Sequence, residues 1–142
     1  MSDIAARIRA SFDKQTMMTT LGARLDRAET GRVVISAPIL STSLQQHGAG
    51  HAALTFGLGD SAAGYAALTT LPEGAEVMTA EIKINLMSPA VGDRLVAEGR
   101  VIRAGRRLVV VASDVWAETA NGRKHVAMLQ GTMIPVTPDA AG

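Results

Sequence analysis

Apolar residues recur at helical spacing at the start of the chain, with charged residues between them. They are Ile4, Ile8, Phe12 and Met17. An apolar stripe of this period predicts one amphipathic helix within residues 1–20. We expect this helix to pack as a lid over the rest of the domain.

Two strand-like runs follow, at 21–29 and 32–39, and the turn signal Thr30-Gly31 lies between them. This arrangement predicts a first antiparallel hairpin. Pro38 has no N–H to donate to a neighbouring strand. It is therefore expected to end the second strand or to lie at a sheet edge.

The segment 49–71 is composed mainly of small residues and predicts a buried helix. Its three glycines, Gly57, Gly59 and Gly64, each lower helix propensity by about 1 kcal/mol relative to Ala. A helix that keeps them is expected to be approached closely by other backbone. Because the segment also contains polar and ionisable residues, it does not read as a membrane span.

The last part of the chain alternates in the manner of β-strands. Four such segments are predicted, at 77–86, 95–103, 108–118 and 124–136, and Asn121-Gly122 is a strong hairpin signal between the last two. We expect them to form a meander of consecutive antiparallel strands. With the first hairpin they give a curved sheet of five to six strands around one central helix, an α+β architecture that matches the hotdog fold in outline.

Length and composition narrow the range of functions. A chain of 142 residues is expected to form a single domain, 1–142, with a frayed tail at 137–142. A net charge of +1 and an aromatic content of 3% do not favour nucleic-acid binding. The absence of Cys excludes thiol catalysis and cysteine-ligated metal, and three His do not predict a metal site. The N-terminus lacks an apolar stretch of signal-peptide length, so we expect a soluble cytoplasmic protein without a membrane segment.

One charged residue stands alone in the small-residue helix. Between Arg32 and Glu73, Asp60 is the only Asp, Glu, Lys or Arg. Burying an isolated carboxylate is costly, so a chain rarely keeps one without a use. Asp60 is therefore the first candidate catalytic group. The alternative is a buried acid satisfied by backbone N–H groups or by Ser61.

The stretch QQHGAGHAA at residues 45–53, followed by Asp60, resembles the hotdog acyl-CoA thioesterases of the PaaI type. In that family an Asn or Gln precedes a Gly and then a His-Gly-Gly motif, and an acidic residue lies farther along the central helix. Gln45, Gly48 and His51 stand at the corresponding positions here.

The resemblance departs from the family at the two residues after His51. The family's Gly-Gly is Ala52-Ala53 here, so two methyl groups take up room beside the site. The backbone N–H of Ala52 survives this change. An oxyanion site at that N–H is therefore retained.

Two later segments extend the resemblance. Residues 77–89 look like the family's central strand, in which a residue at the position of Thr79 helps to position water; the alternative is an ordinary strand threonine. Residues 103–108 are similar to a basic hairpin that contacts coenzyme A; the alternative is a solvated hairpin tip. The residues of this hairpin that would bind substrate are Arg103, Gly105, Arg106 and Arg107.

The resemblance implies hydrolysis of acyl-CoA thioesters, with no cofactor other than the coenzyme A of the substrate. Asp60 would act as general base or nucleophile. The N–H of Ala52, at the start of the helix, would hold the thioester oxygen, and Gln45 would assist or orient it. The alternative for Gln45 and Gln46 is a polar loop that caps the helix. The expected walls of the substrate site are Gly48, His51, Ala53, Phe56, Leu58, Met78 and Met87.

Two other functions remain open from the sequence. One is a non-catalytic acyl-CoA-binding hotdog protein. The other is a hotdog enoyl-CoA hydratase or dehydratase, which usually pairs a His with an Asp a few residues away. Here His51 and Asp60 lie nine positions apart, and His51 is expected to organise the loop rather than act as a base.

Helix geometry bears on how the site is assembled. If Ala52 and Asp60 lie on one regular helix, they are about 12 Å apart along its axis and roughly 80° apart around it. One thioester carbonyl cannot contact both. A shared reaction centre therefore requires a break in the helix or a second subunit. The resemblance implies the second arrangement, a homodimer with shared active sites and often a homotetramer.

Overall fold

The structure, a computed structural model, describes residues 2–137. Nearly all of the predicted frayed tail, 138–142, lies outside the described residues. Three helices and six strands make up the described chain. In order they are α1 (Asp3–Phe12), α2 (Thr16–Thr20), β1 (Arg24–Glu29), β2 (Arg32–Pro38), α3 (Ala52–Leu68), β3 (Glu76–Leu86), β4 (Arg94–Ala104), β5 (Val109–Thr119) and β6 (Gly122–Val136).

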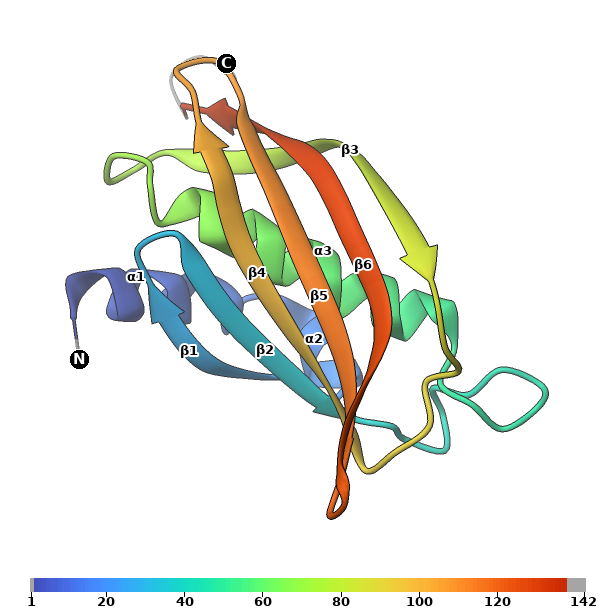
Figure 1. The fold of residues 1–142 in the computed structure, drawn as a ribbon. Helices are drawn as coiled ribbons and strands as arrows, with labels where there is room; N and C mark the ends of the chain where they lie inside the picture. The colour runs from blue at the N-terminus through green and yellow to red at the C-terminus, as the bar shows by residue number, and fades with distance from the viewer. Residues whose placement is uncertain (1, 138–142) are drawn as a thin grey trace.

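All six strands belong to one antiparallel sheet with the order β1-β2-β4-β5-β6-β3 (Figure 1). The predicted hairpin, the end of β2 at Pro38 and the α+β hotdog architecture are confirmed. The predicted four-strand meander is wrong in its first strand, because β3 pairs with β6 at the far edge and β4 returns to pair with β2. The alternation of apolar and polar residues in β3 is the same whether β3 pairs with β4 or with β6. The sequence pattern therefore does not identify the neighbouring strand.

The sheet curves around α3, which crosses its concave face (Figure 1). The face of α3 that meets the sheet is made of small residues, and Ala62, Ala63 and Ala66 are fully buried. Close approach of backbone is permitted by a glycine on the sheet: a Cβ at Gly99 of β4 would collide with the backbone of Ala62 and Ala63. This contact fixes the height of α3 above the sheet.

The three helix glycines play a different part from the one predicted. A Cβ at Gly59 would lie 2.8 Å from a methyl carbon of Leu129, whereas Gly57 and Gly64 meet nothing closer than 3.7 Å and 3.8 Å. The nearest atoms belong to side chains in all three cases. Other backbone does approach α3 closely, as expected, but at Ala62 and Ala63 opposite Gly99 and not at the helix glycines.

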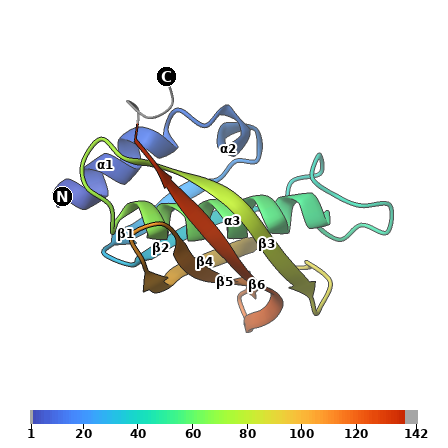
Figure 2. The ribbon, with the colours of Figure 1, turned by 90° about the horizontal axis from the view of Figure 1, so that it is seen from above.

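Two helices, not one, occupy the N-terminal segment, and they cover the side of α3 opposite the sheet (Figure 2). The predicted single helix breaks at residues 13–15, and Met18 rather than Met17 enters the core: Met18 is 3% exposed and Met17 is 60% exposed. The break changes the rotational phase of the helix. An apolar stripe continued from α1 through Met17 therefore selects the wrong methionine for the core. The Phe12 ring packs on that of Tyr65, with centroids 6.2 Å apart.

Arg7 joins α1 to the turn that follows α3. Its guanidinium donates hydrogen bonds to the carbonyl oxygens of Leu71, Pro72 and Ala75, at 2.9, 2.9 and 3.2 Å. These carbonyls lie beyond the last turn of α3 and lead into β3. The contact therefore anchors both the N-terminal helix and the start of β3.

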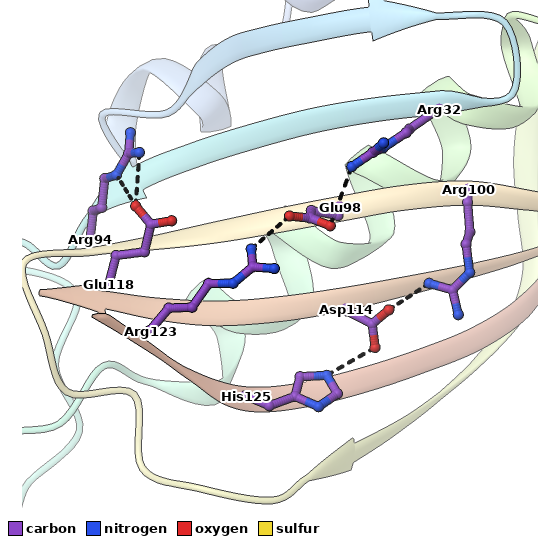
Figure 3. A network of polar contacts seen from close by, with 8 residues as sticks. All are labelled: Arg32, Arg94, Glu98, Arg100, Asp114, Glu118, Arg123 and His125. Atoms are coloured by element: carbon purple, nitrogen blue, oxygen red, sulfur yellow. Dashed lines mark hydrogen bonds and ion pairs between the residues drawn. The ribbon is translucent and has the colours of Figure 1, made fainter. Parts of the chain in front are cut away.

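The outer face of the sheet carries a lattice of arginines and carboxylates (Figure 3). Glu98 accepts from Arg123 and pairs with Arg32, and Asp114 bridges Arg100 and His125. The Trp116 ring stacks on His125, with centroids 4.3 Å apart, and the Arg123 guanidinium lies 4.1 Å from the centroid of the Trp116 ring. Such exposed pairs contribute little stability, but the long arginine stems cover apolar strand surface.

Within residues 2–137 no helix is both long enough and apolar enough to cross a bilayer. In the same part of the chain, no three His, Asp or Glu side chains come together as metal ligands would.

Candidate active site

The loop before α3 is closed by the side chain of Gln45. Its Oε1 accepts from the N–H groups of His47 at 2.6 Å and Ala49 at 3.2 Å. Gly48 takes φ +90° at the turn, a left-handed conformation that favours glycine. The N–H of Gly50 then donates a hydrogen bond to the carbonyl oxygen of Ala90, and α3 begins two residues later.

His51 is the N-cap of α3. Its Nδ1 accepts a hydrogen bond of 2.9 Å from the N–H of Ala53. The next residue, Ala52, is the first of the helix, and its N–H has no acceptor among the described residues. A free N–H at a helix N-terminus, where the dipole favours negative charge, is suited to hold an oxyanion.

A cavity of about 350 Å³ opens at this end of α3. Gln45, Ala52 and Met87 line it, together with Thr55 and the turn after β3. Three of the predicted site residues therefore meet here. Thr55, a buried helix residue, was not predicted to belong to the site.

Asp60 lies farther along α3, beside β3. Its Oδ1 accepts a hydrogen bond of 2.8 Å from Thr79 Oγ1, and Oδ2 has no partner among the described residues. Thr79 Oγ1 also lies 3.3 Å from the sulfur of Met133. The structure thus brings the two predicted residues together and leaves one carboxylate oxygen free to accept from water.

Asp60 is only half-buried in the single chain. The expectation of a buried carboxylate is wrong because its side chain lies on the flank of α3, next to β3, and not on the face that meets the sheet. The sequence pattern could not distinguish these faces, since small residues surround Asp60 on all sides of the helix.

The Asp60 cavity, of about 290 Å³, shares no lining residue with the cavity at Ala52. Both residues belong to α3, which runs without a break from Ala52 to Leu68. Of the two arrangements that could unite them, a break in the helix is therefore excluded. The single chain holds the two halves of the predicted site apart.

The remaining predicted residues are dispersed. His51 and Ala53 line a third, largely apolar cavity with Met17 and Leu44, and Met78 is 64% exposed on β3. Leu58 is fully buried in the core, so its prediction as a pocket wall is wrong.

Arg103 lies at the end of β4, Arg106 and Arg107 lie on the turn between β4 and β5, and all three are exposed. The cavity at Ala52 is near the other end of β4, beside Ala90. A strand of 11 residues separates the two by roughly 35 Å. The turn is nearer to Thr79, because Val109 and Thr79 both pair with Met133 of β6.

Several residues of the Asp60 cavity were missed by the sequence reasoning, and three of them meet at one hydroxyl. They are Ser11, Gln15 and Tyr65. Ser11 and Gln15 come from the N-terminal segment, more than 40 positions from Asp60, and no local spacing connects them. Tyr65, the chain's one tyrosine, is the signal that was available: its hydroxyl needs a partner inside a helix of small residues.

Comparisons with known proteins bear on the family and the fold. The sequence profile of the thioesterase superfamily matches residues 47–122. A candidate esterase from Halobacterium salinarum is 30% identical over 139 residues, covering 92% of this chain and 91% of that protein.

Solved structures give the same result. A thioesterase family protein from Silicibacter pomeroyi has a TM-score of 0.92 at 36% identity, covering 94% of this chain and 98% of that one. The PaaI protein of the phenylacetic acid degradation operon of E. coli has a TM-score of 0.84 at 21% identity, covering 94% and 93%. At that identity the second likeness supports the fold alone. The hotdog fold and the resemblance stated above are confirmed.

Proposed function

Because the chain belongs to the thioesterase superfamily and is an enzyme of that family, we propose that it hydrolyses acyl-CoA thioesters at sites shared between two copies of the chain. The products are the free acid and coenzyme A. The observation that carries the proposal is the position of the two halves of the site, in separate cavities along one unbroken helix.

In this mechanism the thioester carbonyl oxygen lies at the N–H of Ala52. Asp60 takes a proton from water as the water oxygen bonds to the thioester carbon, and the negative charge on the carbonyl oxygen is held by that N–H and the helix dipole. The C–S bond then breaks, and the departing thiolate takes up the proton. Direct attack by Asp60 would instead form an anhydride, which water then opens. Both routes use the oxygen of Asp60 that Thr79 leaves free.

The strand β3 supplies an edge at which a second copy pairs. One side of β3 pairs with β6, and no strand of the described chain lies on its other side. This long edge also exposes Met78 and Leu86, by 64% and 55%. An open edge with exposed apolar residues favours pairing with another strand.

The charges on β3 indicate the register of that pairing. Glu81 and Lys83 lie on the same face and line one surface cavity. A two-fold axis at Ile82 would place Glu81 opposite the partner's Lys83, twice over, whereas an axis at Glu81 or Lys83 would oppose like charges.

Antiparallel pairing of β3 unites the site. It brings the partner's Thr79, with the carboxylate beside it, toward the end of β3 at Leu86 and Met87, where the cavity of Ala52 opens. The partner's basic turn, which lies beyond the start of β3, approaches from the same side. Its guanidinium groups would contact the phosphates of coenzyme A.

The first experiment replaces Asp60. Asp60→Asn keeps the size of the side chain and removes its charge, so thiol release from the best acyl-CoA substrate should fall at least about a hundredfold. Glu73→Gln, the same exchange on an exposed loop, is the matched control. Near-normal turnover by Asp60→Asn would reject the catalytic assignment. Acyl-CoA binding without thiol release by the wild-type protein would favour the non-catalytic alternative.

The second experiment mixes two inactive proteins. Ala52→Pro, combined with Gln45→Ala, removes the oxyanion donor. Proline is tolerated at a first helical position, and no intrahelical bond is lost there. In a heterodimer with Asp60→Asn, both lesions fall in one site and the other site is intact, so up to half of the activity per heterodimer should return. Verified heterodimers that recover nothing, or a fully active monomer, would disprove the shared site.

The third experiment tests the register. Glu81→Lys and Lys83→Glu should each weaken the dimer in sedimentation, because each places like charges opposite one another. The double variant restores opposite charges and should recover the wild-type association. Equal behaviour of all four proteins would exclude an axis at Ile82.

A further inference from the structure

The cavity that contains Asp60 has a second polar group away from the carboxylate. Tyr65, 7% exposed, lines this cavity with Ser11 and Gln15. Gln15 Nε2 donates to the Tyr65 hydroxyl at 2.7 Å, and Ser11 Oγ lies 3.1 Å from the same oxygen. The last turn of α1 and the residue that caps α2 thus meet at one buried hydroxyl.

A count of hydrogens shows that this cluster is incomplete. The Tyr65 oxygen accepts from Gln15, so the contact between the hydroxyls of Tyr65 and Ser11 uses one of their two hydrogens. One hydroxyl hydrogen therefore remains without an acceptor among the described residues. A donor left over in a half-closed cavity needs an acceptor from water or from a ligand.

We propose that Tyr65, held by Gln15 and Ser11, is a specificity-determining residue that donates a hydrogen bond to an oxygen atom of the acyl group. The inference rests on the proposed function, because it places the acyl group in the cavity of the catalytic Asp60. Tyr65 follows Asp60 by five residues, or about 7.5 Å along the helix. The recognised oxygen therefore lies several bonds beyond the reacting carbon.

The charge of the cavity defines the kind of oxygen. Asp60 and Glu76 both line it, and no Lys or Arg does so. A terminal carboxylate on the acyl group would be repelled by these two acids. A neutral keto or hydroxyl oxygen accepts the same hydrogen bond without that cost. The enzyme should therefore prefer neutral, oxygen-bearing acyl groups to their hydrocarbon counterparts.

The test compares hexanoyl-CoA with 5-oxohexanoyl-CoA. The wild-type protein should favour the oxo substrate in kcat/KM by roughly three- to tenfold, the scale of one hydrogen bond. Tyr65→Phe retains the ring on Phe12 and removes the hydroxyl, so this ratio should fall to about one. Ser11→Ala, on the more exposed side of the cluster, should reduce the ratio in part. Thr20→Val, which removes an exposed hydroxyl of α2, should leave both substrates unchanged.

Binding separates this proposal from the catalytic one. Thioether analogues of the two substrates, in which CH₂ replaces the thioester carbonyl, are not hydrolysed, and calorimetry on the wild type and Tyr65→Phe should give the same preference and the same loss. That result would stand even if Asp60→Asn proved fully active. Equal affinity of the wild type for both analogues would overturn the proposal. An equal loss of affinity for both analogues in Tyr65→Phe and in Ser11→Ala would also overturn it. That result is expected if the cluster only holds α1 in place.

Discussion

Replacing Gly99 by Ala should destabilise the protein more than a single methyl group ordinarily does. The new Cβ would overlap the carbonyl group of Ala62 and the nitrogen of Ala63. These are backbone atoms of α3, which cannot move aside as a side chain rotates. Overpacking costs about 1–3 kcal/mol, and contact with fixed backbone favours the upper end. Ala recovers about 0.5–1 kcal/mol through lower backbone entropy in the unfolded chain.

The net loss is therefore about 2 kcal/mol in the free energy of unfolding. For a chain of this length it corresponds to a fall in Tm of roughly 6–8 °C. Thermal unfolding followed by circular dichroism measures it, with chemical denaturation as a second determination. Turnover should also fall, at temperatures well below both transitions, because lifting α3 from the sheet moves Asp60 relative to Thr79.

Gly57→Ala is the matched control. It adds the same methyl group on α3, where the nearest atom, in Leu21, is 3.7 Å away and the contact is ordinary. A glycine replaced by Ala inside a helix should raise stability by up to about 1 kcal/mol. If Gly99→Ala were as stable as the wild type, or if both variants shifted Tm in the same direction, the backbone contact would not set the position of α3.

Three further predictions concern the elements around the site. Arg7→Met should lower the free energy of unfolding by about 2 kcal/mol, since three carbonyls lose a charged donor; denaturant unfolding measures it, and a similar loss in Arg7→Lys would show that charge alone does not suffice. His51→Ala should cost about 1 kcal/mol through the lost cap and His51→Asn should restore most of it, and failure of Asn to do so would contradict the capping role. Arg106→Glu with Arg107→Glu should raise KM for coenzyme A thioesters much more than for a thioester lacking the nucleotide, and equal effects would show that the turn does not contact coenzyme A.

The strands and helices could be predicted from the sequence because their periodicity is local. The β-segments begin and end within three residues of the predicted bounds, and the turn at Gly31 was anticipated. Asp60 could be singled out for the same reason, as its isolation among apolar residues is visible without a fold. The break between α1 and α2 was missed because apolar spacing continues past it while the helical phase changes.

Only the tertiary structure decided which elements became neighbours. The pattern of β3 fits pairing with β4 or with β6 equally well. The choice depends on which edge of the sheet the chain reaches when it emerges from α3, which crosses the sheet. The same crossing places Ser11 and Gln15 beside Tyr65, more than 40 positions away, and leaves Asp60 half-buried on the flank of α3. The close contact was expected at the helix glycines and is made by Gly99 on the sheet. Periodicity records which face of a segment is apolar, whereas contacts between distant segments depend on the packing of the whole chain.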